Sequence, residues 1–158
     1  MSVLGEFRRM PPAHLEEIKA GPENAWDRVS VLSDMLDLDR EWRRLAELMD
    51  RAGFPLNPVT GGAPFPDERC DFGLSLTAEQ VKAAAEHLAV TPFGALEVHL
   101  RPLLEAEAPG PALEPVVSPV DEGRARAIRD RLALAYLLLV GFYRTAAAEG
   151  QCTVFWAA

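Results

Sequence analysis

Residues 132–157, LALAYLLLVGFYRTAAAEGQCTVFWA, join a long apolar helix pattern to a short strand pattern. Within residues 118–149, apolar residues recur at helical spacing. They are Ile128, Leu132, Ala135, Leu139, Phe142 and Ala146. A second set widens this stripe almost all round: Leu134, Leu137, Leu138 and Val140. The pattern predicts a helix buried at the centre of the core, capped by Ser118-Pro119 and ended before Gly150.

The strand pattern at the end of the chain, Cys152–Trp156, carries apolar residues at successive positions. Such a run is typical of a strand that is buried on both faces. At the other end, residues 2–10 alternate weakly until Pro11 and Pro12 interrupt the pattern. We therefore expect the N-terminal and C-terminal strands to pair.

The segments between these strands predict several helices and one further strand. The helices cover 13–20, 23–35, 38–49, 81–88 and 93–100, the strand covers 72–76, and loops cover 53–73 and 108–119. Asp37 or Asp39 is expected to cap the third helix, and Thr77 with Gln80 forms a capping box. Pro102 should kink or break the helix that reaches it.

Length and composition fit one folded domain. A chain of 158 residues with 49% hydrophobic and 25% charged residues has the proportions of a globular protein and can bury one core. We expect a single α+β domain over residues 1–158. Its small sheet pairs the N- and C-terminal strands and packs against several helices, including the long C-terminal core helix.

The charge balance favours some partners over others. Sixteen basic and 24 acidic residues give a net charge of −8, which repels nucleic acid and anionic membranes and attracts a basic protein surface. The apolar run 132–143 is also shorter than the roughly 20 residues of a membrane span. We therefore expect a protein partner, possessing a basic surface, and neither nucleic acid nor membrane.

The first ten residues and the cysteines bear on localisation. Glu6, Arg8 and Arg9 stand where a signal peptide needs an unbroken apolar segment. Cys70 and Cys152 are far apart in sequence and lack the spacing of zinc or redox motifs. A cytoplasmic protein with two free thiols is the simplest expectation.

Several short segments carry a family resemblance through their order and spacing. In the first half they are Gly5-Glu6-Phe7-Arg8-Arg9 with Pro11, Leu36-Asp37-Leu38-Asp39-x-x-Trp42, and Gly61-Gly62. In the second half they are Leu76-Thr77-x-Glu79-Gln80-Val81 and Phe142-Tyr143-x-x-Ala146-Ala147-x-x-Gly150. The chain thus resembles the bacterial YfbM-like family, a domain of unknown function. The resemblance implies an α+β fold and supplies no catalytic residues. Residues 114–119 depart from it, because they lack the Tyr-Pro and Trp often found there.

The Pro- and Gly-rich loop 53–73 is long for a compact domain, which is typical of a functional segment. We predict that ligand- or partner-binding residues lie in this loop and on the helices beside it. They are Trp42, Gly61, Gly62, Phe65, Asp71 and Tyr143. A pocket between the loop and the last helix, lined by Trp42, Phe65 and Tyr143, would suit a small ligand.

Other candidate motifs have simpler explanations. Asp71-Phe72-Gly73 lacks the other kinase motifs, and no Gly-Lys-Ser or Gly-Lys-Thr follows Gly61-Gly62. The carboxylates at 34, 37, 39 and 41 lack the glycine of a calcium loop, and the three histidines, 14, 87 and 99, lack metal-ligand spacing. Cys70, in the 53–73 loop, is the one candidate for a nucleophilic thiol, but a catalytic cysteine also needs a neighbouring histidine to lower its pKa. We therefore predict no catalytic residue, no metal and no cofactor.

Four arginines cluster at the start of the last helix, where positive charge opposes the helix dipole. They are Arg124, Arg126, Arg129 and Arg131. One interpretation is a solvated face with pairs such as Glu122–Arg126; the other is a site for an anion or an acidic partner.

Three functions remain open. The leading hypothesis is a non-enzymatic protein-binding module, in its narrower form an immunity-type protein that occludes a partner, as some small bacterial proteins do. The alternative is a small enzyme or ligand-binding protein with its pocket between the 53–73 loop and the last helix. The third is a subunit of a homo-oligomer, which would show an exposed apolar patch.

Overall fold

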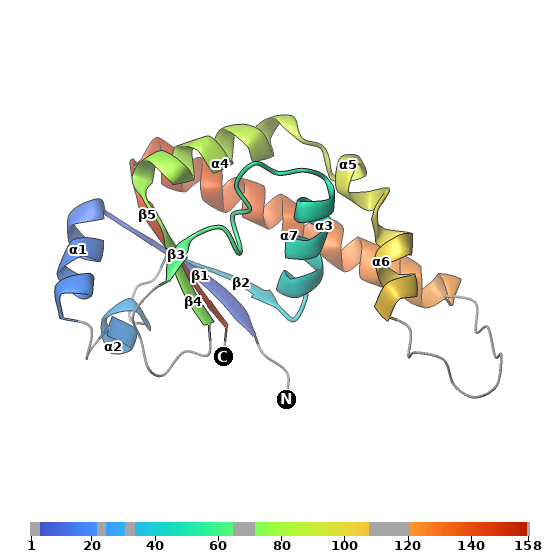
Figure 1. Cartoon of the computed structure of the whole chain (residues 1–158), viewed down its shortest axis with the longest axis horizontal. Coiled ribbons are helices and arrows are strands. Elements are labelled where there is room, and N and C mark those ends of the chain that lie inside the picture. The colour runs from blue at the N-terminus through green and yellow to red at the C-terminus, as the bar shows by residue number, and fades with distance from the viewer. Residues whose placement is uncertain (1–3, 22–24, 31–33, 65–71, 108–120, 158) are drawn as a thin grey trace.

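The computed structural model describes residues 4–21, 25–30, 34–64, 72–107 and 121–157. Five strands in these ranges form one antiparallel sheet of order β2-β1-β5-β4-β3 (Figure 1). The strands are β1 (Gly5–Met10), β2 (Met35–Asp39), β3 (Ala63–Pro64), β4 (Phe72–Leu76) and β5 (Cys152–Ala157). The pairing of the N- and C-terminal strands is confirmed, with Phe7 opposite Phe155 in the β1–β5 register.

Helices cover both faces of this sheet. On one face, α3 (Trp42–Arg51), α4 (Ala78–Val90) and α7 (Glu122–Ala148) share a core with Phe7 and Phe155. On the other, α1 (Pro12–Ala20) and α2 (Ala25–Ser30) contribute Ile18 and Val29 to a smaller cluster with Val154 and Trp156. Two short helices, α5 (Phe93–Glu97) and α6 (Leu100–Glu107), lie beside the N-terminal half of α7 (Figure 1). The predicted single-domain α+β fold is confirmed.

Every residue of β5 is buried, as its apolar sequence predicted. Successive side chains of a strand point to opposite faces, so Phe155 enters the larger core while Val154 and Trp156 enter the smaller one. The rings of Phe7 and Phe155 lie 4.8 Å apart between centroids, and Trp42 lies 5.3 Å from Phe155. This aromatic group joins the sheet to α3 and α7.

The strand β2 was predicted wrongly as the approach to a helix. Its residues alternate between exposed and buried, because Leu36 and Leu38 face the core while the residues between them face outward. Tertiary pairing with β1 selects this two-residue period. Of the helix expected over 23–35, the described residues contain α2. The helix α3 begins at Trp42 with Glu41 at its N-cap position, so neither Asp37 nor Asp39 caps α3.

Other element boundaries also differ from expectation. The capping box of Thr77 and Gln80 is confirmed. The helix break, however, precedes Pro102, which lies in the first turn of α6 where its missing N–H needs no acceptor. The short strand β3 was missed within the predicted 53–73 loop. Asp121 caps α7 by accepting a 2.9 Å hydrogen bond from the Gly123 amide, whereas Ser118-Pro119 lies outside the described residues.

The long helix α7 is buried on one face only, which corrects the expectation of burial almost all round. Its inward stripe includes Leu132, Leu139 and Tyr143, all fully buried. The opposite face exposes Leu134, Leu137 and Leu138, with relative accessibilities of 58%, 66% and 47%. A helix in an outer layer covers the sheet with one stripe and leaves the opposite stripe to solvent.

We expect Tyr143→Phe to destabilise the fold by about 1–3 kcal/mol, because it leaves the Pro58 carbonyl without its buried donor. The Tyr143 hydroxyl donates to that carbonyl at 2.9 Å and lies 3.2 Å from the Thr153 hydroxyl. Tyr136→Phe is the matched control, since its hydroxyl bonds the Thr91 carbonyl at a part-buried position that water can reach. Urea unfolding should show the larger loss for Tyr143, and equal losses would contradict this assignment.

Stability should also fall at alkaline pH. Burial raises the pKa of Tyr136 to about 12 and that of Tyr143 further, against about 10 in an unfolded chain. Between those values the folded state holds more protons, so stability is complete below about pH 10 and decreases as pH rises. Unfolding midpoints across this range test the effect. Tyr143→Phe should reduce the slope of the unfolding midpoint against pH. An unchanged slope would contradict the role of Tyr143 burial.

Candidate functional site

Of the residues predicted to bind a ligand, Trp42 and Tyr143 lie in the core, whereas Gly61 is exposed and Gly62 is half-buried. Trp42 is 8% exposed and Tyr143 fully buried, so neither side chain is open to a ligand. A Cβ at Gly61 would lie 2.6 Å from the Asn57 carbonyl oxygen, and one at Gly62 would lie 2.7 Å from the Ser75 carbonyl oxygen. Both glycines therefore permit close backbone packing. Phe65 and Asp71 lie outside the described residues.

The described part of the loop is tied down by a buried asparagine. The Asn57 amide nitrogen donates to the Ala46 carbonyl and to the Asp50 carboxylate, each at 2.8 Å. Its side-chain oxygen accepts from the amides of Val59 and Thr60 at 3.0 and 3.4 Å. These bonds satisfy both ends of the amide and hold the loop on α3.

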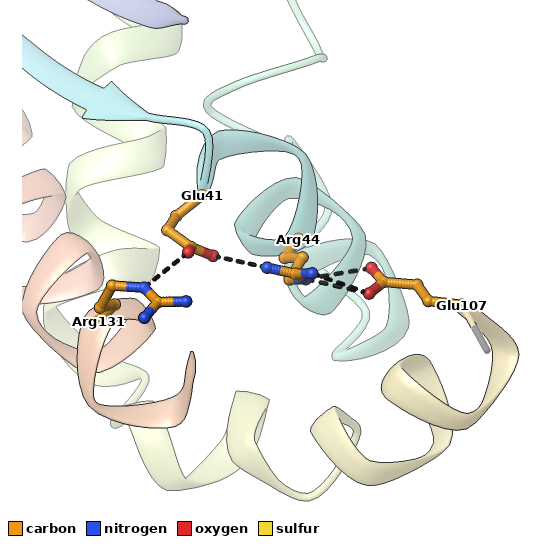
Figure 2. Close-up of polar contacts among 4 residues, drawn as sticks. All are labelled: Glu41, Arg44, Glu107 and Arg131. Atoms are coloured by element: carbon orange, nitrogen blue, oxygen red, sulfur yellow. Dashed lines mark hydrogen bonds and ion pairs between the residues drawn. The ribbon is translucent and has the colours of Figure 1, made fainter. Parts of the chain in front are cut away.

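A network of charged side chains connects α3, α6 and α7 (Figure 2). Glu41 receives a hydrogen bond from Arg131 Nε at 3.0 Å and one from Arg44 at 3.3 Å. Arg44 also binds Glu107 through Nε and Nη2, at distances of 3.1–3.2 Å. Residues far apart in sequence thus meet where the start of α3 and the end of α6 approach the N-terminal half of α7.

The network borders a cavity of about 390 Å³. Its lining adds Arg40 and Arg43 to the four residues of the network, which gives four arginines against two glutamates. The cavity is thus locally positive in a chain of net charge −8. The Arg43 guanidinium lies 5.2 Å from the centre of the Trp42 ring, a cation–π distance. We call this set of residues the arginine groove.

The two arginines of the network differ in how many of their N–H donors remain available to a ligand. Burial lowers the pKa of Arg44, but its bonds to Glu107 and Glu41 outweigh that effect and raise it above the ordinary value. Arg44 is therefore a fixed structural cation. Arg131 uses only Nε toward Glu41, and its terminal nitrogens point away from that bond without a partner in the described residues (Figure 2). Those nitrogens are donors held in a set orientation.

A second cavity, of about 460 Å³, lies on the opposite flank of α7. Arg129 Nε donates to Glu97 at 2.6 Å, and Arg101 donates to Glu122 at 2.7 Å. The predicted Glu122–Arg126 pair is therefore wrong, because Glu122 bonds across to α6. Arg126 also lines the cavity and has no ion-pair partner in the part of the chain that the structure describes. The pKa values of Arg129 and Arg101 are raised by their hydrogen bonds to Glu97 and Glu122.

Sequence reasoning singled out the arginines of α7 but missed those at the start of α3. The signal was present in the run Arg40-Glu41-Trp42-Arg43-Arg44, which places basic residues around one carboxylate. This run alone does not reveal the network, because Arg131 and Glu107 are brought next to Glu41 and Arg44 only by the tertiary fold. No group of three or more metal-ligating side chains is found within the described ranges. The Cys152 thiol is buried, and burial raises its pKa.

Comparison with known proteins places the fold in a recognised family. The chain matches the domain of unknown function DUF1877 over residues 1–156. The chain belongs to this family. The match covers nearly all of the sheet and every described helix, and the predicted YfbM-like resemblance is confirmed.

A solved structure shares the fold of this chain. The crystal structure of YfbM from Escherichia coli, a protein of unknown function, matches with a TM-score of 0.68 and 18% identity. The alignment covers 98% of this chain and 99% of that chain. At this identity the similarity establishes a shared fold. No curated protein matches the chain.

We expect Glu41→Gln to lower stability by about 1–2 kcal/mol, because it leaves two guanidinium groups without their shared anion. The Glu41 side chain is only 13% exposed, whereas its partner Arg131 is 57% exposed, which limits the loss. Glu47→Gln is the matched control: its pair with Arg51 is a solvated i,i+4 contact on the same helix. It should cost less than about 0.5 kcal/mol. Equal losses in urea unfolding would contradict a network held by Glu41.

Proposed function

We propose that this DUF1877 protein is a non-enzymatic protein-binding module whose arginine groove receives an acidic segment of a partner protein. The observation that carries the proposal is the guanidinium of Arg131, which bonds Glu41 through Nε only. Its Nε bond to Glu41 fixes the plane of the group, while its terminal nitrogens remain donors. A fixed planar donor pair matches the two oxygens of a carboxylate.

The neighbouring arginines extend this donor set. Arg43 is held against the Trp42 ring, and Arg40 is exposed without an ion-pair partner among the described residues. Fixed arginines lose less side-chain entropy on binding than free ones, which favours their use in recognition. An acidic side chain entering here would meet cations from α7 and from the start of α3.

The arrangement suits an extended partner surface better than one small molecule. The two cavities, of 460 and 390 Å³, flank the same helix, and α6 contributes Arg101 to one and Glu107 to the other. Arginine lines both. A segment with several carboxylates can contact both flanks, whereas a compact ligand reaches one. Arginine is also enriched among residues that dominate binding energy at protein interfaces.

The groove differs in sign from the whole molecule. The net charge of −8 acts on an approaching partner at long range, but salt screens it beyond about 8 Å under physiological conditions. At contact distance the four arginines of the groove, against two glutamates, determine which charge the partner surface must carry. A basic partner surface, an immunity-type role and a cytoplasmic location stay predictions. The alternative ligand pocket includes residues 65–71, which lie outside the described ranges.

The test is capture of partners by the tagged protein from its native cells, with charge-reversed variants compared side by side. Arg40→Glu with Arg43→Glu should release a stoichiometric partner, because both reversals place negative charge at the groove. Lys82→Glu is the matched control, since Lys82 is an exposed residue of α4 that lines neither cavity. Asp37→Lys with Asp39→Lys on β2 tests the basic-partner prediction in the same experiment.

Each result has a defined meaning. Loss of the partner with the groove variant alone, and weaker binding of the wild type at higher salt, would support the proposal. Loss with the β2 variant alone would overturn it in favour of a basic partner at the acidic edge of the sheet. Absence of any stoichiometric partner would also contradict a binding module.

A further inference from the structure

The outer face of α7 carries an apolar stripe that the monomer leaves in water. Residues spaced alternately by four and three along this face are Gly123, Ala127, Asp130, Leu134, Leu137, Gly141, Arg144 and Ala148. That spacing averages 3.5 residues, which is the repeat of helices that pack along each other. Leu134 and Leu137 are more than half exposed, and Leu138 adjoins them at 47%. We call this the outer stripe.

Contiguous leucines on a helix face are unfavourable in water and typical of a contact surface. α7 is, in the described part of the chain, the one helix with the length and hydropathy of a membrane span. Its inward face, however, is occupied by the core through Leu132, Leu139 and Tyr143. The helix therefore has one free face and two polar flanks, a geometry that suits another helix.

The charges on the stripe are arranged symmetrically about Leu137. Asp130 lies seven residues before it and Arg144 seven residues after it, each about 10.5 Å along the axis. When two copies of α7 pack antiparallel with Leu137 on the twofold axis, Asp130 of each copy faces Arg144 of the other. Arg144 has no ion-pair partner among the described residues, and Asp130 meets only its neighbour Arg129.

The same register matches large residues with small ones. Leu134 of one copy reaches the second helix beside Gly141. A Cβ at Gly141 would find nothing within 4 Å in the monomer, so the monomer does not require glycine there. Glycine is unfavourable in a helix interior, yet it opens a space that a leucine of a second helix can fill.

From these observations we propose that the protein forms a twofold homodimer through antiparallel packing of α7 on α7, with the outer stripe as the interface. The contact is self-complementary, as a twofold interface requires. It leaves the arginine groove on the flank of α7, so that the dimer presents two such grooves. None of the stripe residues lines the arginine groove, although Asp130 also lines the second cavity.

Sedimentation equilibrium tests the dimer in solution. The wild type should show twice the chain mass of 17.3 kDa, and Leu137→Glu should shift the protein to a monomer by placing two carboxylates at the axis. Met35→Glu is the matched control, because Met35 is a comparably exposed apolar residue, at 46%, on the sheet face away from α7. Circular dichroism confirms that each variant is folded. A wild-type monomer at micromolar concentrations would overturn the proposal.

Charge exchange and cross-linking test the register. Arg144→Asp should weaken the dimer at least tenfold, and the double variant Asp130→Arg with Arg144→Asp should restore it. In a Cys70→Ala background, Leu137→Cys should form an intermolecular disulfide. Asp130→Cys alone should not, because the two copies of residue 130 lie roughly 21 Å apart in an antiparallel pair.

Two results would overturn the arrangement. Cross-linking of both single cysteines would indicate parallel helices. Binding of a monomeric wild type to vesicles of anionic and zwitterionic phospholipid, abolished by Leu137→Glu, would assign the outer stripe to a membrane surface instead.

Discussion

The whole structure depends on the burial of β5 on both of its faces. All six of its residues are buried, and it takes the central position between β1 and β4. A central strand with apolar side chains on both faces needs a helical layer on each side. The chain meets this need with α3, α4 and α7 on one face and α1 with α2 on the other. Since β1 pairs with β5, the two ends of the chain close the domain together.

The burial of β5 also explains why the aromatic residues pack between the sheet and the helices. Phe7, Phe155, Trp42 and Tyr143 form one connected group between the sheet and its larger helical layer. Tyr143 also reaches the Pro58 carbonyl, and Asn57 ties the same loop to α3. Trp42 and Tyr143, two of the three residues predicted to line a ligand pocket, are thus part of the packed core. The charged side chains of the arginine groove come instead from the start of α3, the end of α6 and the N-terminal half of α7.

The ion pairs around α7 contribute more to orientation than to stability. Most are partly solvated, and such pairs contribute about 0–1 kcal/mol each. Their effect is to fix arginine side chains while leaving some donors unused, as at Arg131. One helix therefore presents three different surfaces: a core-packing face inward, charged flanks, and an apolar stripe outward. A 3.6-residue period separates these sides around one axis.

The sequence by itself determined the elements whose patterns are local and strong. It predicted the paired terminal strands, the doubly buried strand at the C-terminus, the capping box at Thr77 and the long last helix, because side-chain period and capping chemistry act within a few residues. It also carried the family resemblance. Only the tertiary structure decided that residues 35–39 form a strand, since β1 supplies the ladder that a short alternating segment cannot form alone.

Tertiary structure also decided the candidate site. Glu41 and Arg131 are 90 residues apart in sequence, and Arg44 and Glu107 are 63 apart, so no spacing rule brings them together. The burial of α7 on one face only has the same origin: an apolar pattern states which residues prefer to leave water, but the number of neighbouring layers decides which of them do so. That is the physical reason why Leu132 is buried and Leu137 is exposed on the same apolar helix.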